Sequence, residues 1–470
     1  MACDFLITMR ACATELPAVR VGMSSCRTRA CAGTQRETAG VPRGAVRAEG
    51  RAVVEVQPIS GALRARGARG RKGLLALLTG GMLVFATACG GGGGSDDGKK
   101  DGSGDKGGGG RKTSRAVVAI TPRDGAKGVN THGALKVTSD KGKLTSVKVK
   151  DPKGKEIDGK ITEDGGSWRP SRHLSSATTY TVDAVAKDSQ GLTASQHSSF
   201  TTLRPEKTFV GVYTPEDGSK VGVGMPVSIH FTRGITDPGA VERGIKVSAS
   251  PSVPIEGHWF GNDRLDFRPE KYWAPGTKVT LSMDLDGVEG RPGVYGEQKK
   301  TVKFTIGRSQ ISVVDAKSKK MVVKRDGKTI KTLPITSGAP GYETYNGKMV
   351  ISERLAVTRM NGATVGYDGQ YDIKDVPHAM RLSTSGTFIH GNYWAGKPTF
   401  GSANVSHGCV GLFDQRGGGD KSTPAAWFFR NSIVGDVVVV KNSHDDTVQP
   451  DNGLNGWNMS WAKWKADQKG

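Results

Sequence analysis

Short runs in which apolar and polar residues alternate recur along the chain from about residue 113, and Pro and Gly separate them. Clear examples are residues 134–138, 178–184, 226–231 and 278–283. A period of two sends successive side chains to opposite faces of a strand, so these runs predict half-buried β-strands. We therefore expect a mostly β fold.

Two similar blocks contain most of these runs. "AITPRDGAKGV", from Ala119, is matched by "VYTPEDGSKVG", from Val212, and the blocks end in "FTT" and "FTI". Strands and turns at this spacing are typical of β-sandwiches of about 100 residues. We predict two sandwiches in tandem, at 113–205 and 207–307. Their simplest role is that of a spacer, and ligand binding is the alternative.

From Ser309 the pattern changes and indicates a third unit at 308–442. "KKMVVKRDGKTIKTLPI" predicts a hairpin whose Asp326-Gly327 pair suits a tight primed turn, and "DVVVVK" predicts the closing strand. The polar stretches between them are expected to be functional loops on a mostly β core. These stretches carry Met360, Tyr371, His378, His390, Trp394 and the only cysteine of this unit.

The tail at 443–470 contains three tryptophans at helical spacing. Trp457, Trp461 and Trp464 are four and three residues apart, which predicts one face of a short helix. We expect this apolar face to pack back onto the preceding domains.

Composition supports several small β-domains, because only 6% of the 470 residues are aromatic and the 67 glycines show no period. The formal net charge is +22. An anionic cell wall or membrane surface is favoured as the neighbour of such a chain, and nucleic acid is not expected as a partner. Lysines that only keep the surface soluble are the alternative.

A basic cluster followed by "GLLALLTGGMLVFATAC" has the layout of an export signal, at 61–89. The apolar run is too short to span a bilayer, and it ends in small residues. "ATAC" resembles a bacterial lipobox, which would lipidate Cys89 and anchor the protein to the outer face of the cell membrane. Residues 90–112 are expected to be a Gly-rich linker, and residues 1–60 a miscalled or disordered extension.

Cleavage before Cys89 would leave Cys409 as the single unmodified thiol of the mature protein. A disulfide within the chain and a four-ligand zinc site would then lack partners, and a leftover cysteine in an exported protein indicates a reactive thiol or an intermolecular bond. Cys409 lies in "SANVSHGCVGL", with His407 two residues before it and His390 nineteen before it. A Cys–His nucleophilic pair, a metal site with two His and one Cys, and a buried structural thiol all fit this chemistry.

The segment "HGNYWAGKPTFGSANVSHGCVGL" resembles the active-site pattern of L,D-transpeptidases, in which a histidine precedes Ser-His-Gly-Cys by about fifteen residues. The chain after residue 70 resembles the actinobacterial lipoprotein form of that family. That form has a lipobox, two immunoglobulin-like domains, a YkuD-like catalytic domain and a Trp-bearing tail. Carbapenem-type β-lactams inhibit the family, and no metal or organic cofactor is implied.

The resemblance implies that Cys409 attacks the bond between diaminopimelate and the terminal D-Ala of a peptidoglycan stem. The amine of a second diaminopimelate would take the thioester and form a 3→3 cross-link. His390 would be the general base and acid, oriented by the carbonyl of Gly391, and the enzyme is expected to act as a monomer. Other implied site residues are His407 in the cleft, Gly408 at the oxyanion hole, and Ser406, Met360, Tyr371, Asn392 and Trp394 around the substrate.

Gly411 departs from the family pattern, because many relatives carry Asn or Arg two residues after the cysteine. Asn392 could supply the missing polar group, or donor affinity could be lower. An L,D-carboxypeptidase would use the same residues, with water in place of the acceptor amine. A non-catalytic wall-binding lipoprotein is the alternative from a different class.

Overall fold

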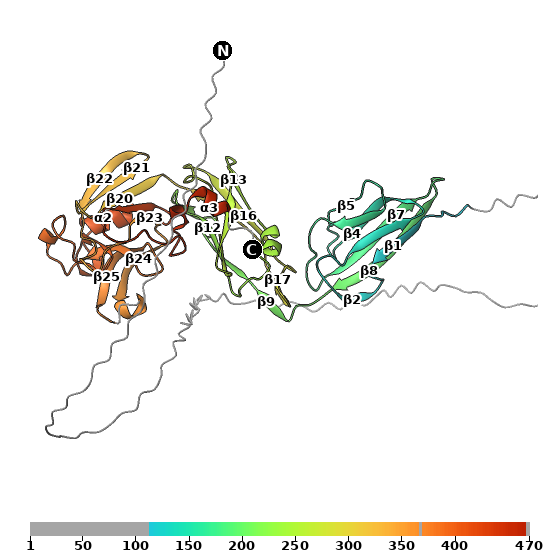
Figure 1. Ribbon diagram of the computed structural model, residues 1–470, viewed down its shortest axis with the longest axis horizontal. Helices are drawn as coiled ribbons and strands as arrows, with labels where there is room; N and C mark the ends of the chain where they lie inside the picture. The colour runs from blue at the N-terminus through green and yellow to red at the C-terminus, as the bar shows by residue number, and fades with distance from the viewer. Residues whose placement is uncertain (1–111, 366–368, 467–470) are drawn as a thin grey trace, which may run out of the picture. The chain divides into compact units, whose positions relative to one another are not determined.

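The computed structural model describes residues 112–365 and 369–466. The predicted extension at 1–60, the export signal with Cys89, and all but the last residue of the 90–112 linker lie outside the described residues. Within the described ranges, no helix is both long and apolar enough to cross a membrane. Figure 1 gives the order of the elements along the chain.

The prediction of a mostly β fold is confirmed, and the first body is a sandwich of two four-stranded sheets. One sheet has the order β1 (Val117–Thr121), β3 (Lys136–Asp140), β6 (Ser167–Pro170), β5 (Gly159–Ile161). The other has the order β2 (Ala126–Val129), β8 (Thr193–Thr202), β7 (Thr179–Lys187), β4 (Lys143–Lys150). Alternate side chains of β7 are buried, so Tyr180, Val182 and Ala184 form part of the core between the sheets.

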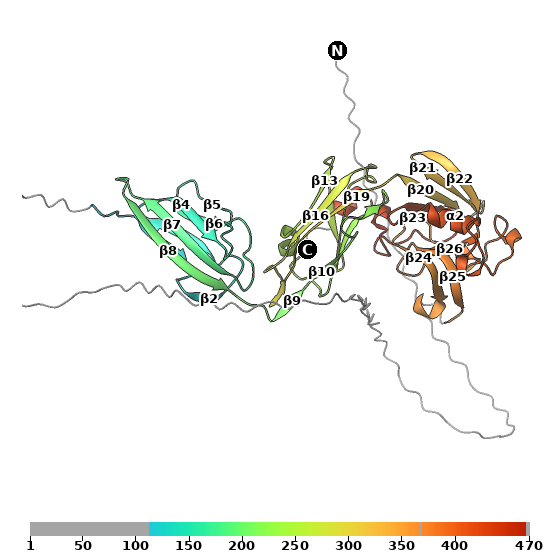
Figure 2. The ribbon, with the colours of Figure 1, turned by 180° about the vertical axis from the view of Figure 1, so that it is seen from behind.

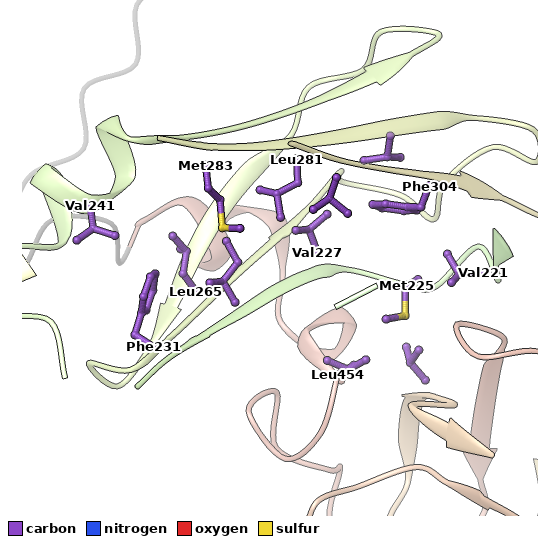
Figure 3. Close-up of a cluster of buried hydrophobic side chains, with 14 of the residues drawn as sticks. Val221, Met225, Val227, Phe231, Val241, Leu265, Leu281, Met283, Phe304 and Leu454 are labelled. Carbon is purple, nitrogen blue, oxygen red and sulfur yellow. The ribbon is translucent and has the colours of Figure 1, made fainter. Parts of the chain in front are cut away.

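The second body is also a sandwich. One sheet has the order β10 (Gly211–Thr214), β12 (Val227–Phe231), β15 (Arg264–Arg268), β14 (Glu256–Phe260). The facing sheet has the order β11 (Lys220–Val221), β19 (Lys299–Ile306), β16 (Lys278–Asp284), β13 (Ile245–Ser250). A small sheet of β17 (Glu289–Arg291), β18 (Val294–Gly296) and β9 (Lys207–Phe209) and the short helix α1 (Pro238–Arg243) complete it. Figure 3 shows the buried side chains between the sheets, among them Val227, Leu265 and Leu281.

The core of the second sandwich extends into the third unit and the tail. Val350 and Val437 of the third unit and Leu454 and Trp457 of the tail belong to the same buried cluster. Trp457 Nε1 donates a hydrogen bond of 2.7 Å to the carbonyl of Gly224. The second sandwich therefore shares one hydrophobic core with the unit that follows it.

The tryptophan tail differs from the single helix predicted from its spacing. Trp457 lies in the 3-10 turn η4 (Gly456–Asn458), and only Trp461 and Trp464 lie in the helix α3 (Trp461–Ala466). The two elements are separated by extended backbone at Met459. All three rings nevertheless pack against the guanidinium of Arg268, with centroid distances of 4.2 to 5.3 Å. The three tryptophans therefore contact the same residue although they do not share one helix.

The third unit consists of two sheets. The first has the order β22 (Lys328–Pro334), β21 (Lys320–Arg325), β20 (Gln310–Asp315), β28 (Val437–Lys441), β23 (Gly347–Val350). The second has the order β24 (Glu353–Asn361), β25 (Asp372–Arg381), β26 (Phe388–Asn392), β27 (Val410–Phe413). Short helices connect the strands: η1 (Gly362–Val365), η2 (Lys397–Thr399), η3 (Arg416–Gly418) and α2 (Pro424–Arg430). Figure 2 shows β24, β25 and β26 together in this unit.

The expectation of functional loops in this unit was partly wrong. Met360, His378 and His390 lie within β24, β25 and β26, whereas Trp394 and Cys409 lie outside the strands, Cys409 directly before β27. Every residue of β26 is buried, so its sequence Phe-Ile-His-Gly-Asn shows no alternation of apolar and polar side chains. A strand that is buried on both faces lacks the period-two pattern from which strands are predicted.

Candidate active site

Two neighbouring parallel strands bring the candidate nucleophile and base to one place. β26 carries His390 and pairs with β27, in the register His390 opposite Gly411 and Ile389 opposite Val410. Cys409 directly precedes β27. Both side chains line one pocket, which is formed by Met360, Tyr371, Ile373, His390, Asn392, Trp394, Val405, Ser406, His407 and Cys409.

His390 is buried, and one of its ring nitrogens is engaged. Nδ1 lies 3.0 Å from the carbonyl oxygen of Gly391. A carbonyl only accepts hydrogen bonds, so Nδ1 carries the proton and Nε2 keeps its lone pair. Burial lowers the pKa of His390 below its ordinary value, and the bond to Gly391 opposes that shift. The imidazole is therefore neutral near pH 7 and able to accept a proton at Nε2. Trp394 stacks on the ring at 5.5 Å.

Cys409 is held as a thiol in this structure. Its Sγ donates a hydrogen bond of 3.5 Å to the carbonyl of Gly386. Burial raises the pKa of Cys409 to about 11, and the positive charge of Arg381 is among the smaller opposing effects. The resting protein therefore holds a thiol rather than a thiolate at this position near pH 7.

The turn that carries Cys409 is fixed by hydrogen bonds to the segment after β22. Gly411 and Thr336 exchange two backbone hydrogen bonds, of 2.8 and 3.0 Å. Ser406 Oγ donates to the carbonyl of Cys409 at 2.6 Å, within the turn. Gly408 has a φ of +102°, a conformation open to glycine and costly for other residues. This backbone turns its amide groups in directions that a regular strand would not allow.

His407 and Asn392 form part of the pocket wall. The ring of His407 contacts the rings of Tyr342 and Tyr371, with centroid distances of 4.6 and 5.3 Å. Asn392 Oδ1 accepts a hydrogen bond of 3.0 Å from the amide of Ala395, which fixes the orientation of its side-chain amide. A Cβ added at Gly411 would lie 2.7 Å from Thr336 Cγ2 and 3.4 Å from Asn392 Nδ2. The Asn392 amide thus occupies the space beside Gly411.

The pocket contains residues that the sequence analysis did not single out. Ile373 and Val405 line it, Tyr342 contacts His407, and Gly386 accepts from the thiol. Val405 lies within the quoted cysteine segment, so its position next to Ser406 could have identified it as a pocket residue. Gly391 and Gly408 are not among the residues lining the pocket. Across residues 112–365 and 369–466, no group of three or more His, Cys, Asp or Glu side chains could hold a metal ion.

Comparison with known protein families places two domains on the chain. A model described as a bacterial Ig domain matches residues 126–289, and one described as the L,D-transpeptidase catalytic domain matches residues 309–440. The second match contains both His390 and Cys409.

Individual proteins of Mycobacterium tuberculosis are similar over most of the chain. L,D-transpeptidase 2 is 31% identical over 401 residues, which are 84% of this chain and 95% of that protein. L,D-transpeptidase 5 is 29% identical, over 73% of this chain and 75% of its own length. A solved structure of the L,D-transpeptidase LdtMt1 in complex with imipenem is 29% identical, covers 50% of this chain and all of its own, and has a TM-score of 0.42.

Proposed function

This chain belongs to the L,D-transpeptidase family, and we propose that Cys409 is its nucleophile and that it forms 3→3 cross-links in peptidoglycan. The observation that carries the proposal is the shared pocket, which is lined both by a neutral imidazole whose proton lies on Nδ1 and by the free thiol of Cys409. A base with a free lone pair beside a nucleophile that must lose a proton is the arrangement that covalent acyl transfer requires.

In the first half of the proposed reaction the thiol proton passes from Cys409 Sγ to His390 Nε2. Sγ attacks the carbonyl carbon between diaminopimelate and the terminal D-Ala of the donor stem, and the carbonyl oxygen becomes an oxyanion. Backbone amides around Gly408 are proposed to stabilise this charge, which backbone N–H groups do well at a water-excluded site. His390 then gives its proton to the leaving nitrogen, D-Ala departs and a thioester remains.

In the second half the side-chain amine of diaminopimelate on another stem attacks the thioester. His390 accepts a proton from this amine, and the tetrahedral intermediate collapses and expels Cys409 Sγ. The sulfur recovers its proton from His390, so the protein ends as it began. The net change is one amide bond broken and one formed, with free D-Ala as the second product.

The remaining pocket residues are proposed to hold the stem peptides. Met360, Tyr371, Trp394 and His407 provide apolar and aromatic surfaces around the reacting atoms. Asn392 is proposed to supply the polar group next to Gly411, because its Nδ2 lies beside the space that a side chain at 411 would need. Ser406 supports the cysteine turn through the carbonyl of Cys409.

The test is incubation of the purified protein with a tetrapeptide-stem disaccharide, with the Cys409→Ala variant as control and mass spectrometry as readout. A dimer that has lost one D-Ala, absent with the variant, is the expected product. Tripeptide monomer alone would mean that water takes the thioester and that the protein is an L,D-carboxypeptidase. No turnover by the natural sequence would contradict both enzymes and favour a wall-binding role.

Carbapenem-type β-lactams are proposed as inhibitors, because their strained amide presents the same kind of carbonyl to Cys409. Opening of the ring by Sγ would leave a thioester whose mass adds to that of the protein. Intact-mass spectrometry after exposure to imipenem is expected to show one adduct on the natural sequence and none on Cys409→Ala. An adduct on both would place the acylation at another residue.

Anchoring at the outer face of the cell membrane through a lipidated Cys89 is also proposed, from the lipobox-like "ATAC". The protein would then meet peptidoglycan while tethered by the Gly-rich linker. Replacement of Cys89 by Ala should move the protein from the membrane fraction to the soluble fraction of the producing cell. Retention of the variant in the membrane would contradict the lipid anchor.

A further inference from the structure

An imidazole–carboxylate pair lies on the face of β26 that is turned away from the active-site pocket. His378 Nδ1 is 2.7 Å from Asp414 Oδ2. The Asp414 side chain is fully buried, and that of His378 is 13% exposed. Thr423 Oγ1 and the amide of Gln415 each donate a hydrogen bond of 2.8 Å to Asp414 Oδ1. Neither member of the pair lines the pocket, and the proposed reaction does not use them.

The carboxylate contacts the backbone that orients the catalytic base. His390 and Asn392 line the pocket, so Gly391 between them faces the opposite side of the strand. A Cβ added at Gly391 would lie only 2.3 Å from Asp414 Oδ2 and 2.7 Å from Asp414 Cβ. A glycine is therefore required for the carboxylate to approach this closely. The carbonyl of the same Gly391 accepts the hydrogen bond from His390 Nδ1.

His378 adopts a backbone conformation that needs support from its surroundings. Its φ is +54°, which is uncommon for residues other than glycine, although Asn, Asp and His tolerate it better than most. Phe429 of α2 contacts its ring at 5.0 Å, and Gly418 is so close that an added Cβ would lie 2.8 Å from His378 Cε1. Such conformations persist where the surrounding contacts fix them, and they cluster at functional sites.

We infer that Asp414 and His378 are a positioning pair. They hold Gly391 so that its carbonyl keeps accepting the hydrogen bond from His390 Nδ1. The inference rests on the proposed function, in which His390 is the base. Glycine is the residue whose peptide plane rotates most freely, so a carbonyl on glycine is a precise acceptor only if something else fixes it. The pair supplies that constraint from behind the strand, as outer hydrogen-bond partners do for histidines that bind metal ions.

Three variants separate positioning from simple packing. His378→Phe keeps a ring against Phe429 but removes the donor to Asp414. His378→Asn keeps a side-chain N–H at nearly the place of Nδ1 and tolerates a positive φ. The matched control is His197→Phe, because His197 and Asp183 form a pair with the same 2.7 Å spacing on the exposed surface of the first sandwich.

The expected result is a fall in kcat of about 10- to 100-fold for His378→Phe in the cross-linking assay. Its KM should change little, because neither member of the pair touches the pocket. His378→Asn and His197→Phe should keep kcat close to that of the natural sequence. Equal losses in His378→Phe and His378→Asn, or a loss carried mainly by KM, would overturn the inference. If His378→Phe fails to fold, His378→Gly replaces it, since glycine accepts the backbone conformation and also lacks the donor.

A readout that does not depend on turnover separates this inference from the proposed function. The Nδ1–H proton of His390 should give a slowly exchanging resonance in the natural sequence and in His378→Asn, and exchange rapidly in His378→Phe. A protected resonance in all three would overturn the positioning role even if cross-linking is observed. Absence of cross-linking by the natural sequence would instead refute the proposed function and leave the resonance to decide the positioning.

Discussion

The resting thiol of Cys409 should react slowly with any reagent that does not use His390. Burial raises its pKa from the ordinary 9.0 to about 11. A rise of two units in the pKa reduces the thiolate fraction at neutral pH by about 100-fold relative to an unperturbed cysteine. Iodoacetamide reacts with the thiolate, so its rate should rise about tenfold per pH unit from pH 7 to pH 10.

Acylation by imipenem should behave differently, because the proposed reaction delivers the thiol proton to His390. Burial lowers the pKa of His390 below its ordinary 6.5, so the imidazole is already neutral at pH 7. Raising the pH from 7 to 9 should therefore leave the acylation rate nearly constant while alkylation increases by about 100-fold. The shape of each profile is compared rather than the absolute rate, since limited access to a buried sulfur slows both reagents.

Both rates can be followed by intact-mass spectrometry on the same protein preparation. His390→Gln should abolish acylation and keep the slope of the alkylation profile. An alkylation rate that has already reached its plateau at pH 7 would mean that a thiolate–imidazolium pair exists at rest. Parallel profiles for the two reagents would mean that His390 does not deprotonate the thiol, and either result would refute the reasoning.

Three further substitutions, two of them with a matched control variant, test the cysteine turn, the pocket wall and the tail. Gly408→Ala should lose acylation by imipenem and about 1–2 kcal/mol of stability. The control Gly327→Ala, at a φ of +81° in open space, should lose stability alone. Intact-mass spectrometry of the imipenem adduct measures acylation, and thermal unfolding measures stability. Asn392→Asp keeps the acceptor for Ala395 and removes the Nδ2 donor, so KM for the tetrapeptide donor should rise while the fold persists. Trp464→Ala should cost about 3–5 kcal/mol in denaturant unfolding, and Trp461→Ala less, because Trp464 is fully buried and Trp461 is not.

The sequence sufficed to identify features that short segments carry by themselves. The alternating runs predicted strands that the structure contains, such as β7 and β16, and the cysteine segment identified Cys409 and His390 as candidates. Contacts between distant segments could not be predicted in this way. Gly386 accepts from a thiol 23 residues later, and His378 meets Asp414 across 36 residues. These contacts depend on the register of β25, β26 and β27, and a fully buried β26 gives no periodic signal from which to derive that register.

The pKa shifts of Cys409 and His390 indicate which step of the proposed reaction needs stabilisation by the protein. Burial raises the pKa of Cys409 and lowers that of His390, so both shifts favour the neutral pair over thiolate and imidazolium. Proton transfer alone is therefore uphill and cannot drive attack. It becomes productive when the negative charge moves on from sulfur to the substrate oxygen, where backbone amides can stabilise it. The proposed reaction therefore predicts that Cys409 reacts with a carbonyl held against the Gly408 turn and leaves unpositioned electrophiles largely untouched.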